Sequence, residues 1–360
     1  MLNQDSPSQV GILYLGGTIG CAGRPLAPLS ADIFLPHLAS ILKTDLTPSL
    51  QATDAEEHHV IEWHYFSGKI KDSSALVPED WSDILELLLN QQNSHIHHWI
   101  ILHGTDTLSY TAAFLSAALQ GTQIKVVVTG SQLPLLDSTQ RSLNTTSDAL
   151  GNIKTALSAL TNRTLNGGWV RVAFNYRHWI ADGVQKTHTH DLTAFTGLDI
   201  NPALNQNKPI FELQTLLKHS PRFKTELTQL NIQIYYASPL PQDVLVSQIE
   251  NILMNGANAV ILLAYGLGNL LDDLRIHRAL LVAEQRGVMV VVSTQVPFGG
   301  VEPRYAAGNW LAACGVLSGG SLPVSTIFAR LAWLQITTRT FAERRKRWLE
   351  YLALIPHEFN

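Results

Sequence analysis

Short apolar runs alternate along this chain with longer segments in which apolar residues recur every three or four positions. The short runs favour strands buried on both faces of a parallel sheet, whereas the longer periodicity is typical of amphipathic helices. Because the two kinds of segment alternate, the first half of the chain predicts a doubly wound, flavodoxin-like sheet. The expected strands are Val10–Leu15, Val60–Phe66, Trp99–Leu102, Lys125–Thr129 and Trp169–Phe174, and the expected helices are Ala31–Lys43, Pro78–Asn90, Leu108–Leu119 and Leu143–Leu160.

This alternation stops between Thr196 and Leu230, where Asn-Pro and Ser-Pro pairs interrupt the chain and no clear period is present. Such a stretch is typical of a connector between domains. We therefore expect an α/β protein with an N-terminal domain over 1–195 that carries the active site, a connector over 196–230 and a smaller Rossmann-like C-terminal domain over 231–360. In that last domain the expected strands are Ile232–Tyr236, Ala259–Leu263 and Val288–Ser293, and the expected helices are Asp243–Met254, Asp272–Arg286, Pro323–Gln335 and Phe341–Leu354.

Composition narrows the class of protein. The 360 residues are 46% hydrophobic and 15% charged, which is enough apolar material for large cores and too little charge for a disordered chain. The formal net charge of −4 provides no broad basic field for nucleic acid. No apolar stretch is long and clean enough to span a membrane, and residues 1–9 lack the features of a signal peptide, so we expect a cytoplasmic protein.

Two threonine motifs come directly after apolar runs. Gly16-Gly17-Thr18-Ile19-Gly20 follows the run that ends at Leu15, and His103-Gly104-Thr105-Asp106-Thr107 follows the run that ends at Leu102. Open α/β sheets bind ligands beyond the carboxyl ends of their strands, where glycines let the backbone approach a ligand closely. A threonine hydroxyl becomes a nucleophile there once a base activates it. The alternative for each motif is structural, with its polar side chains capping the helix that follows.

Three further segments carry polar groups of the same kind. Asp72-Ser73-Ser74 precedes a predicted helix and suits a carboxylate ligand, although taken alone this segment favours ordinary turn chemistry. Gly130-Ser131 follows another apolar run. Lys186 lies close in sequence to two threonines and an aspartate, and such a lysine either relays protons or is an ordinary surface residue.

Cysteines, histidines and one basic run offer weaker signals. Cys21 and Cys314 are far apart and favour free thiols over a disulfide or zinc site. His95, His97 and His98 cluster before a strand, and His188 and His190 are expected on one face of another. A His-x-His pair can bind a metal, but no third ligand with convincing spacing accompanies either pair, so we expect no metal. The run Arg344 to Arg347 favours a solvated helix face over a binding patch.

In combination these motifs resemble the bacterial-type L-asparaginase family, most closely its cytoplasmic type I branch. The two threonine motifs match the family's signature motifs, and Asp72-Ser73-Ser74, Gly130-Ser131-Gln132 and Lys186 follow in the family's order. Farther along, Tyr265 to Asn269 and Tyr305 to Asn309 are similar to landmarks of its C-terminal domain. The resemblance covers nearly the whole chain.

The resemblance implies a role for each matched residue. Thr18 would be the nucleophile, while Thr105, Asp106 and Lys186 would form a second catalytic group. Asp106 would also bind the substrate ammonium. The α-carboxylate would bind at Ser73, helped by Asp72 and Ser74, and Ser131 would offer a backbone contact to the substrate amide. The family's chemistry needs no metal and no cofactor.

Three departures from the family pattern are visible. The loop after the first motif is short and has Leu26 near the place of the family's tyrosine. The segment Ser138-Thr139-Gln140 lacks a structural acid. Leu263 and Val296 occupy the places of an arginine and a cysteine that form an effector site in some type I enzymes. An effector site of that kind is therefore not expected.

The sequence thus predicts hydrolysis of L-asparagine to L-aspartate and ammonia through an acyl-enzyme on Thr18. The resemblance also implies a homodimer or homotetramer in which a neighbouring subunit closes the site. Two alternatives stay open: an inactive asparaginase fold that senses an amino acid, and the asparaginase-like subunit of a tRNA-dependent amidotransferase.

Overall fold

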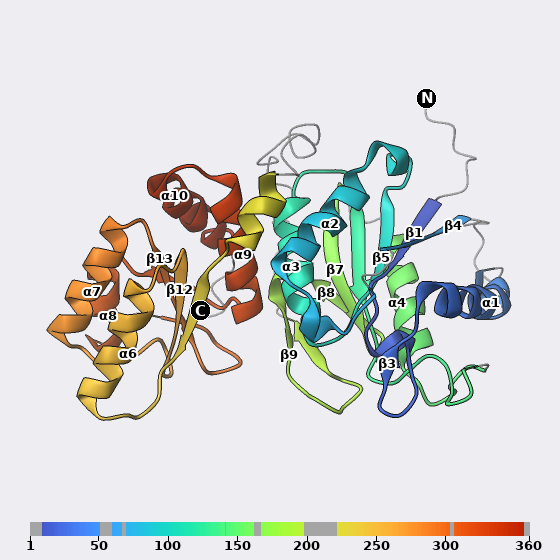
Figure 1. Cartoon of the computed structure of the whole chain (residues 1–360), viewed down its shortest axis with the longest axis horizontal. Coiled ribbons are helices and arrows are strands. Elements are labelled where there is room, and N and C mark those ends of the chain that lie inside the picture. The colour runs from blue at the N-terminus through green and yellow to red at the C-terminus, as the bar shows by residue number, and fades with distance from the viewer. Residues whose placement is uncertain are drawn as a thin grey trace. The chain divides into compact units, whose positions relative to one another are not determined.

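The structure is a computed structural model that describes residues 9–50, 60–66, 70–140, 142–161, 167–197, 222–302 and 306–355 (Figure 1). The chain divides into two compact units. Unit 1 comprises Met1–Leu198 with Asn205–Leu217, and unit 2 comprises Asp199–Leu204 with Lys218–Asn360. Each unit has its own sheet covered by helices, which confirms the expected α/β class.

Unit 1 is built on a six-stranded sheet in the order β4-β1-β5-β6-β7-β8. The first five strands of this order run parallel, and β8 at the edge is antiparallel to β7. In β1, β5 and β6 the central positions are mostly Val, Ile and Leu and are buried, as the apolar runs predicted, whereas the edge strands β4 and β8 are partly exposed. The strands are β1 (Gln9–Tyr14), β4 (Val60–Tyr65), β5 (His98–Leu102), β6 (Lys125–Thr129), β7 (Trp169–Phe174) and β8 (Arg177–Ile180).

Helices cover both faces of this sheet (Figure 1). The α1 helix (Ala31–Leu50) and α4 (Ala149–Thr161) share one core with β1, β5 and β6. On the other face α2 (Pro78–Leu89) packs against α3 (Leu108–Ala118), and the rings of Trp81 and Phe114 stack there at 4.8 Å. Smaller elements complete the unit: hairpin strands β2 (Cys21–Ala22) with β3 (Ala27–Pro28) and β9 (Val184–Lys186) with β10 (Phe195–Gly197), and the 3₁₀ turns η1 (Thr18–Gly20), η2 (Ser73–Ala75), η3 (Gln91–Asn93) and η4 (Ala181–Gly183).

Unit 2 has a four-stranded parallel sheet in the order β11-β12-β13-β14. Its helices α6, α7 and α8 share one core on one face, and α9 and α10 lie on the other (Figure 1). The strands are β11 (Ile232–Tyr236), β12 (Ala259–Ala264), β13 (Met289–Thr294) and β14 (Leu317–Ser318), and the helices are α6 (Gln242–Met254), α7 (Leu274–Gln285), α8 (Ala306–Ala313), α9 (Val324–Thr337) and α10 (Phe341–Leu352).

Two expectations from the sequence were wrong. The helix expected from Leu143 begins only at Ala149, because Asn144 and Ser147 accept hydrogen bonds from backbone N–H groups two residues ahead and so favour turns. His188 and His190 do not lie on a strand; they lie in the loop between β9 and β10. Most of the expected connector, residues 198–221, falls outside the described residues. Among the helices described here, none combines the length and apolarity needed to cross a membrane.

Candidate active site

Three loops from separate strands of unit 1 meet at the carboxyl edge of its sheet. Gly17 follows β1, Gly104 follows β5, and Ser73 lies in the segment between β4 and α2. A Cβ atom added at Gly17 would lie 2.2 Å from the Cα of Gly104, and one added at Gly104 would lie 2.5 Å from Ser73 Oγ. The backbones of Gly17 and Gly104 are therefore in direct contact, and the Ser73 side chain lies against Gly104. The glycines are required because a side chain on either would separate these groups.

Hydrogen bonds lock two of these loops together. The hydroxyl of Ser73 accepts from the Asp106 N–H at 3.2 Å, and the Thr107 hydroxyl donates to the Ser73 carbonyl at 2.8 Å. Ser73 is buried by these contacts. Its neighbours Asp72 and Ser74 are exposed, and Asp72 accepts from the Ser74 N–H at 2.8 Å as the cap of η2. The structural alternative therefore describes Asp72 well.

Helix capping does not describe the two threonine motifs. The cap of η1 is Gly17, and Thr18 is the first residue of the turn with its side chain half-buried. The cap of α3 is Thr107, which makes no capping bond with its side chain. Thr105 and Asp106 precede that cap. Their polar side chains are therefore held at the sheet edge by contacts other than those of a helix end.

Lys186 joins the second threonine motif from 80 residues away in the chain. Its Nζ atom donates to Thr105 Oγ1 at 2.9 Å and to Asp106 Oδ1 at 2.7 Å. The Lys186 side chain is 21% exposed and that of Asp106 58%. The Lys186 side chain is thus partly shielded, while the Asp106 carboxylate is largely exposed to solvent. These contacts place a cation, a hydroxyl and a carboxylate within one hydrogen-bonded group.

His103 holds the backbone next to this hydrogen-bonded group in place. Burial lowers the pKa of the His103 imidazole to about 4, so the ring is neutral at physiological pH. The Gly104 carbonyl, which can only accept, is 2.7 Å from His103 Nδ1, so that nitrogen carries the proton. Nε2 then accepts from the Thr111 hydroxyl at 2.9 Å, and that hydroxyl accepts from Trp81 Nε1 at 3.0 Å. This chain of bonds fixes the peptide that precedes Thr105.

The loop after β6 is organised by two side chains that the sequence motifs did not include. Asp148 accepts from the N–H groups of Gln132 and Leu133 at 3.0 to 3.1 Å, and Asn152 Nδ2 donates to the Gly130 carbonyl at 2.9 Å. The Ser131 side chain is buried here and donates to the Leu133 carbonyl at 2.6 Å. An aspartate directly before α4 was the available signal, but the helix was expected to begin at Leu143, which hid it.

Comparison with known proteins identifies the family to which this architecture belongs. The family model "Asparaginase, N-terminal" matches residues 9–215, and the model "Glutaminase/Asparaginase C-terminal domain" matches residues 232–347. The chain belongs to the asparaginase family. It is 30% identical over 333 residues to L-asparaginase 1 of Escherichia coli K12, with 90% of each chain covered.

Other members of the asparaginase family show the same extent of likeness. The crystal structure of L-asparaginase I from Vibrio cholerae superposes with a TM-score of 0.72 at 26% identity, covering 95% of this chain and 97% of that one. The L-asparaginase of Thermococcus kodakarensis is 29% identical over 346 residues, which cover 93% of this chain and 95% of that protein. The resemblance to the type I branch is thereby confirmed.

The departures from the asparaginase pattern have local structural consequences. Leu26, near the place of the family's tyrosine, is 55% exposed in the β2–β3 hairpin. The thiol of Cys21 donates to the Gly17 carbonyl at 3.2 Å, and burial raises the pKa of this thiol to about 11. In the segment that lacks the expected acid, Asp137 accepts from the N–H and hydroxyl of Thr139. The carboxylate of Asp137, the residue before Ser138, therefore organises this turn.

The histidine clusters have contacts of their own. His95 Nε2 lies 2.7 Å from Glu62 Oε1, and His188 Nδ1 accepts from the Asp191 N–H at 2.7 Å. Within the described ranges, no group of three or more His, Cys, Asp or Glu side chains is arranged to hold a metal ion.

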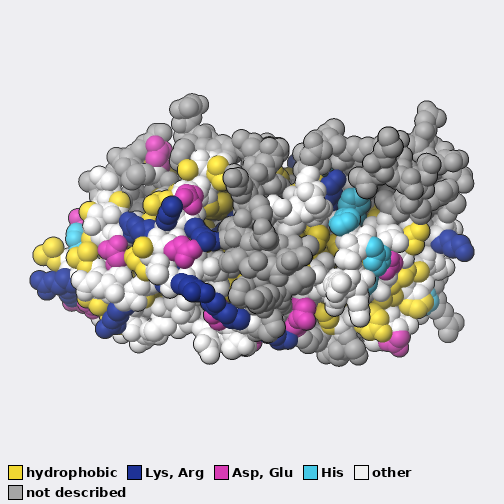
Figure 2. Space-filling model, turned by 90° about the horizontal axis from the view of Figure 1, so that it is seen from above, with side chains coloured by type: hydrophobic (Ala, Val, Ile, Leu, Met, Phe, Trp, Pro, Cys, Tyr) yellow, Lys and Arg dark blue, Asp and Glu magenta, His cyan; other side chains and the backbone are white. Residues whose placement is uncertain are grey.

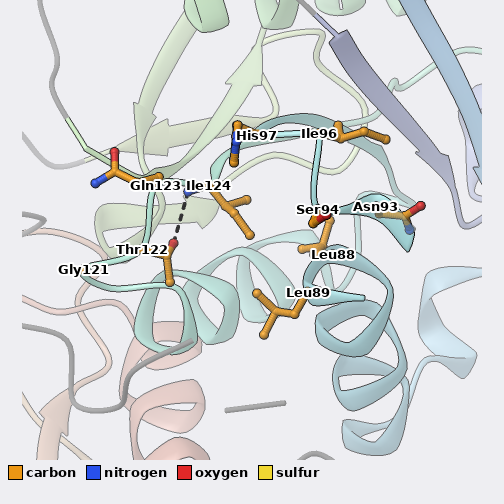
Figure 3. Close-up of a pocket in the computed structure, with 10 residues that line it drawn as sticks. All are labelled: Leu88, Leu89, Asn93, Ser94, Ile96, His97, Gly121, Thr122, Gln123 and Ile124. Atoms are coloured by element: carbon orange, nitrogen blue, oxygen red, sulfur yellow. Dashed lines mark hydrogen bonds between the residues drawn. The ribbon is translucent and has the colours of Figure 1, made fainter. Parts of the chain in front are cut away.

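A cavity of about 300 Å³ lies in unit 1 away from the threonine motifs (Figure 3). It lies where α2 ends and β5 and β6 begin, which is the amino edge of the sheet. Leu88, Leu89 and Ile124 turn their side chains toward it. Ligands of such sheets bind at the carboxyl edge, and this cavity is not lined by Thr18, Thr105 or Lys186, so it is not the candidate active site.

Proposed function

We propose that this protein hydrolyses L-asparagine to L-aspartate and ammonia. Membership of the asparaginase family supports a hydrolase that acts on amides, and the relative from Escherichia coli is an L-asparaginase. The observation that carries the proposal is the direct contact between Gly17 and Gly104. Because of this contact, the backbone segments that carry Thr18 and Thr105 lie close together at one edge of the sheet. A small substrate held between two hydroxyl groups requires this proximity.

In the proposed reaction Thr18 is the nucleophile. Its Oγ1 attacks the side-chain amide carbon of asparagine, the hydroxyl proton passes to the departing nitrogen, and ammonia leaves an ester on Thr18. Water then attacks this ester, releasing aspartate and returning a proton to Thr18. Lys186 donates to Thr105 and Asp106 and would relay protons through this group in both steps.

Substrate recognition follows from the charges at the edge. The Asp106 carboxylate would pair with the substrate ammonium, and the neighbourhood of Ser73, with Asp72 and Ser74, would bind the α-carboxylate. The backbone at Ser131 would contact the side-chain amide. Gly17 has φ 80° and ψ 178°, a conformation almost confined to glycine. In the proposed reaction, backbone N–H groups near Thr18 would stabilise the developing oxyanion.

A nucleophile test distinguishes the two threonines. Thr18→Ala should lower kcat by several orders of magnitude, because loss of a covalent nucleophile costs on the order of several kcal/mol in the barrier. Thr18→Ser should retain measurable turnover, and Thr146→Ala, in an exposed turn, should behave as wild type. With wild type, hydroxylamine should divert product to aspartyl hydroxamate. Hydroxamate formed by Thr18→Ala but not by Thr105→Ala would assign the nucleophile to Thr105 instead.

The two alternatives predict different results for purified protein. A sensor would bind asparagine, seen as a rise in Tm, and release no ammonia. An amidotransferase subunit would release ammonia efficiently only with its partner and tRNA. We further propose that the protein is cytoplasmic and forms a homodimer or homotetramer in which a neighbouring subunit closes the site. Light scattering during gel filtration measures the mass, and a monomer with full activity would contradict this assembly.

A further inference from the structure

Unit 2 contains a polar cavity of about 470 Å³ at the amino edge of its sheet. Asn258, directly before β12, forms part of its wall, with Thr338 and Arg339 from the end of α9 and Arg344 from the first turn of α10. All of these residues belong to unit 2, whereas Thr18 and the other proposed catalytic residues belong to unit 1. The cavity is therefore separate from the reaction proposed above.

Most of the basic run on α10 is neutralised by nearby carboxylates. In Figure 2 dark blue and magenta side chains intermix on the left, on the surface of unit 2. Three members of the run make ion pairs: Arg345 with Glu284 at 3.3 Å, Lys346 with Glu350 at 3.8 Å and Arg347 with Glu343 at 2.6 Å. Of these three residues only Lys346 is fully exposed, whereas Arg345 and Arg347 are partly buried.

Arg344 is the exception in this run. Its Nη2 donates to the Gly287 carbonyl at 3.3 Å, and its Nε is buried with no hydrogen-bond partner among the described residues. Burial also lowers the pKa of the Arg344 guanidinium, because it removes solvent from the charge. The Glu343 carboxylate also attracts this charge, but it is paired with Arg347. A partly buried arginine without an ion pair of its own is costly and favours a bound counter-ion.

The other charges around the cavity leave it positive. Arg222 is paired with Glu226 at 2.7 Å, so these two cancel. Arg339 is exposed, and in the described part of the chain its guanidinium has no ion pair. Arg339 and Arg344 are thus two guanidinium groups on one cavity without carboxylate partners. Two planar forks of N–H donors are the arrangement that suits a phosphate or another dianionic oxyanion.

We propose that this cavity binds the dianion of a phosphate monoester, with the phosphate between Arg339 and Arg344. The volume of the cavity is more than ten times that of one water molecule in the liquid, which is about 30 Å³. The cavity therefore has room for more than the phosphate group. Its remaining wall includes the amides of Gln229, Asn258 and Gln335 and the Thr338 hydroxyl. These neutral polar groups suit a hydroxylated organic part such as a sugar.

The test is ligand binding by the full-length protein at fixed ionic strength. Inorganic phosphate and ribose 5-phosphate should each raise Tm saturably and bind in calorimetry, the monoester more tightly. Arg339→Gln and Arg344→Gln should each weaken this binding by at least about tenfold, since each removes charge-assisted hydrogen bonds. Lys346→Gln is the matched control, because it makes the same charge change on α10 outside the cavity, and it should bind as wild type.

Three outcomes would overturn the proposal. The first is an absence of saturable binding of either probe at millimolar concentration. The second is an equal loss in Arg339→Gln and Lys346→Gln, which would indicate general charge attraction. The third is an equal affinity for inorganic phosphate and the monoester, which would mean that the wall beyond the arginines contacts nothing. Arg339 is exposed, so its variant tests the site even where Arg344→Gln fails to fold.

Discussion

Gly17 and Gly104 contact each other through their backbones, and this contact sets the distance between the two threonine motifs. The Cα of Gly104 occupies the space that a Cβ atom on Gly17 would need, at 2.2 Å. The glycines therefore act as spacers of the smallest size. Thr18 and Thr105 are their next neighbours in sequence, so any enlargement at the contact moves one hydroxyl relative to the other.

We predict that Gly17→Ala lowers kcat/KM by about a hundredfold or more, since a misplacement near 1 Å has an effect of that size. Gly167→Ala is the matched control. It also places alanine at a positive φ, +75° against +80°, but nothing lies within 4 Å of its added Cβ. Both variants should lose some stability from backbone strain, on the order of 1–3 kcal/mol. Equal activity of the two variants in an ammonia-release assay would show that the contact does not position the threonines.

We also predict that Lys186→Met lowers kcat by about 10²–10⁴-fold, the usual contribution of a positioned acid or base. Methionine keeps the length of the side chain but cannot donate to Thr105 or Asp106. Lys154→Met, on the exposed side of α4, is the control and should be neutral. The measurement is steady-state kinetics on asparagine across pH. A loss confined to KM would assign Lys186 to substrate binding through Asp106 rather than to proton transfer.

The sequence predicted the strands of the sheets well, because their apolar runs are continuous and depend little on context. Lys125–Thr129, Trp169–Phe174 and Ile232–Tyr236 match the observed strands at both ends. Helix starts were predicted less well where short polar side chains compete for the backbone, as Asn144 and Ser147 do before α4. The short strands β8, β9 and β10 carry too few residues to show a period and were not anticipated.

The candidate site was predictable only as a set of strand ends. Threonine motifs after apolar runs indicate which residues reach the sheet edge, but not which of them touch. Lys186 lies 81 residues from the hydroxyl that it contacts in Thr105, and no local pattern encodes that pairing. For the same reason the supporting role of His103 became visible only in three dimensions.

The lowered pKa of His103 predicts that the folded protein loses stability in acid. Its pKa is about 4 when folded against an ordinary 6.5, so the unfolded chain binds the extra proton between these values. Stability should therefore fall as pH drops from about 6.5 to about 4, by roughly 1.4 kcal/mol per unit and about 3 kcal/mol in all. Urea unfolding at several pH values measures this. His103→Gln should show a shallower dependence over that range, whereas His97→Gln, at an exposed position, should follow wild type.

The hydrogen bonds of the Gln132 side chain are expected to hold the loop that follows Lys186. Its Nε2 donates to the carbonyls of Thr189 and Asp191 at 3.0 and 3.1 Å, which ties the loop after β6 to the loop between β9 and β10. Gln132→Glu removes both donors and turns a carboxylate toward two carbonyl oxygens, a change of about 1.4 kcal/mol, which corresponds to roughly tenfold in opening. Hydrogen exchange at residues 189–193 should rise by that factor. The kcat/KM for asparagine should fall by roughly 3–10-fold, because Lys186 is then less firmly positioned.

Gln123→Glu, which makes the same change at the opposite edge of the sheet, should alter neither quantity. Unchanged exchange in Gln132→Glu would mean that the β9–β10 loop is held by its own turn contacts alone.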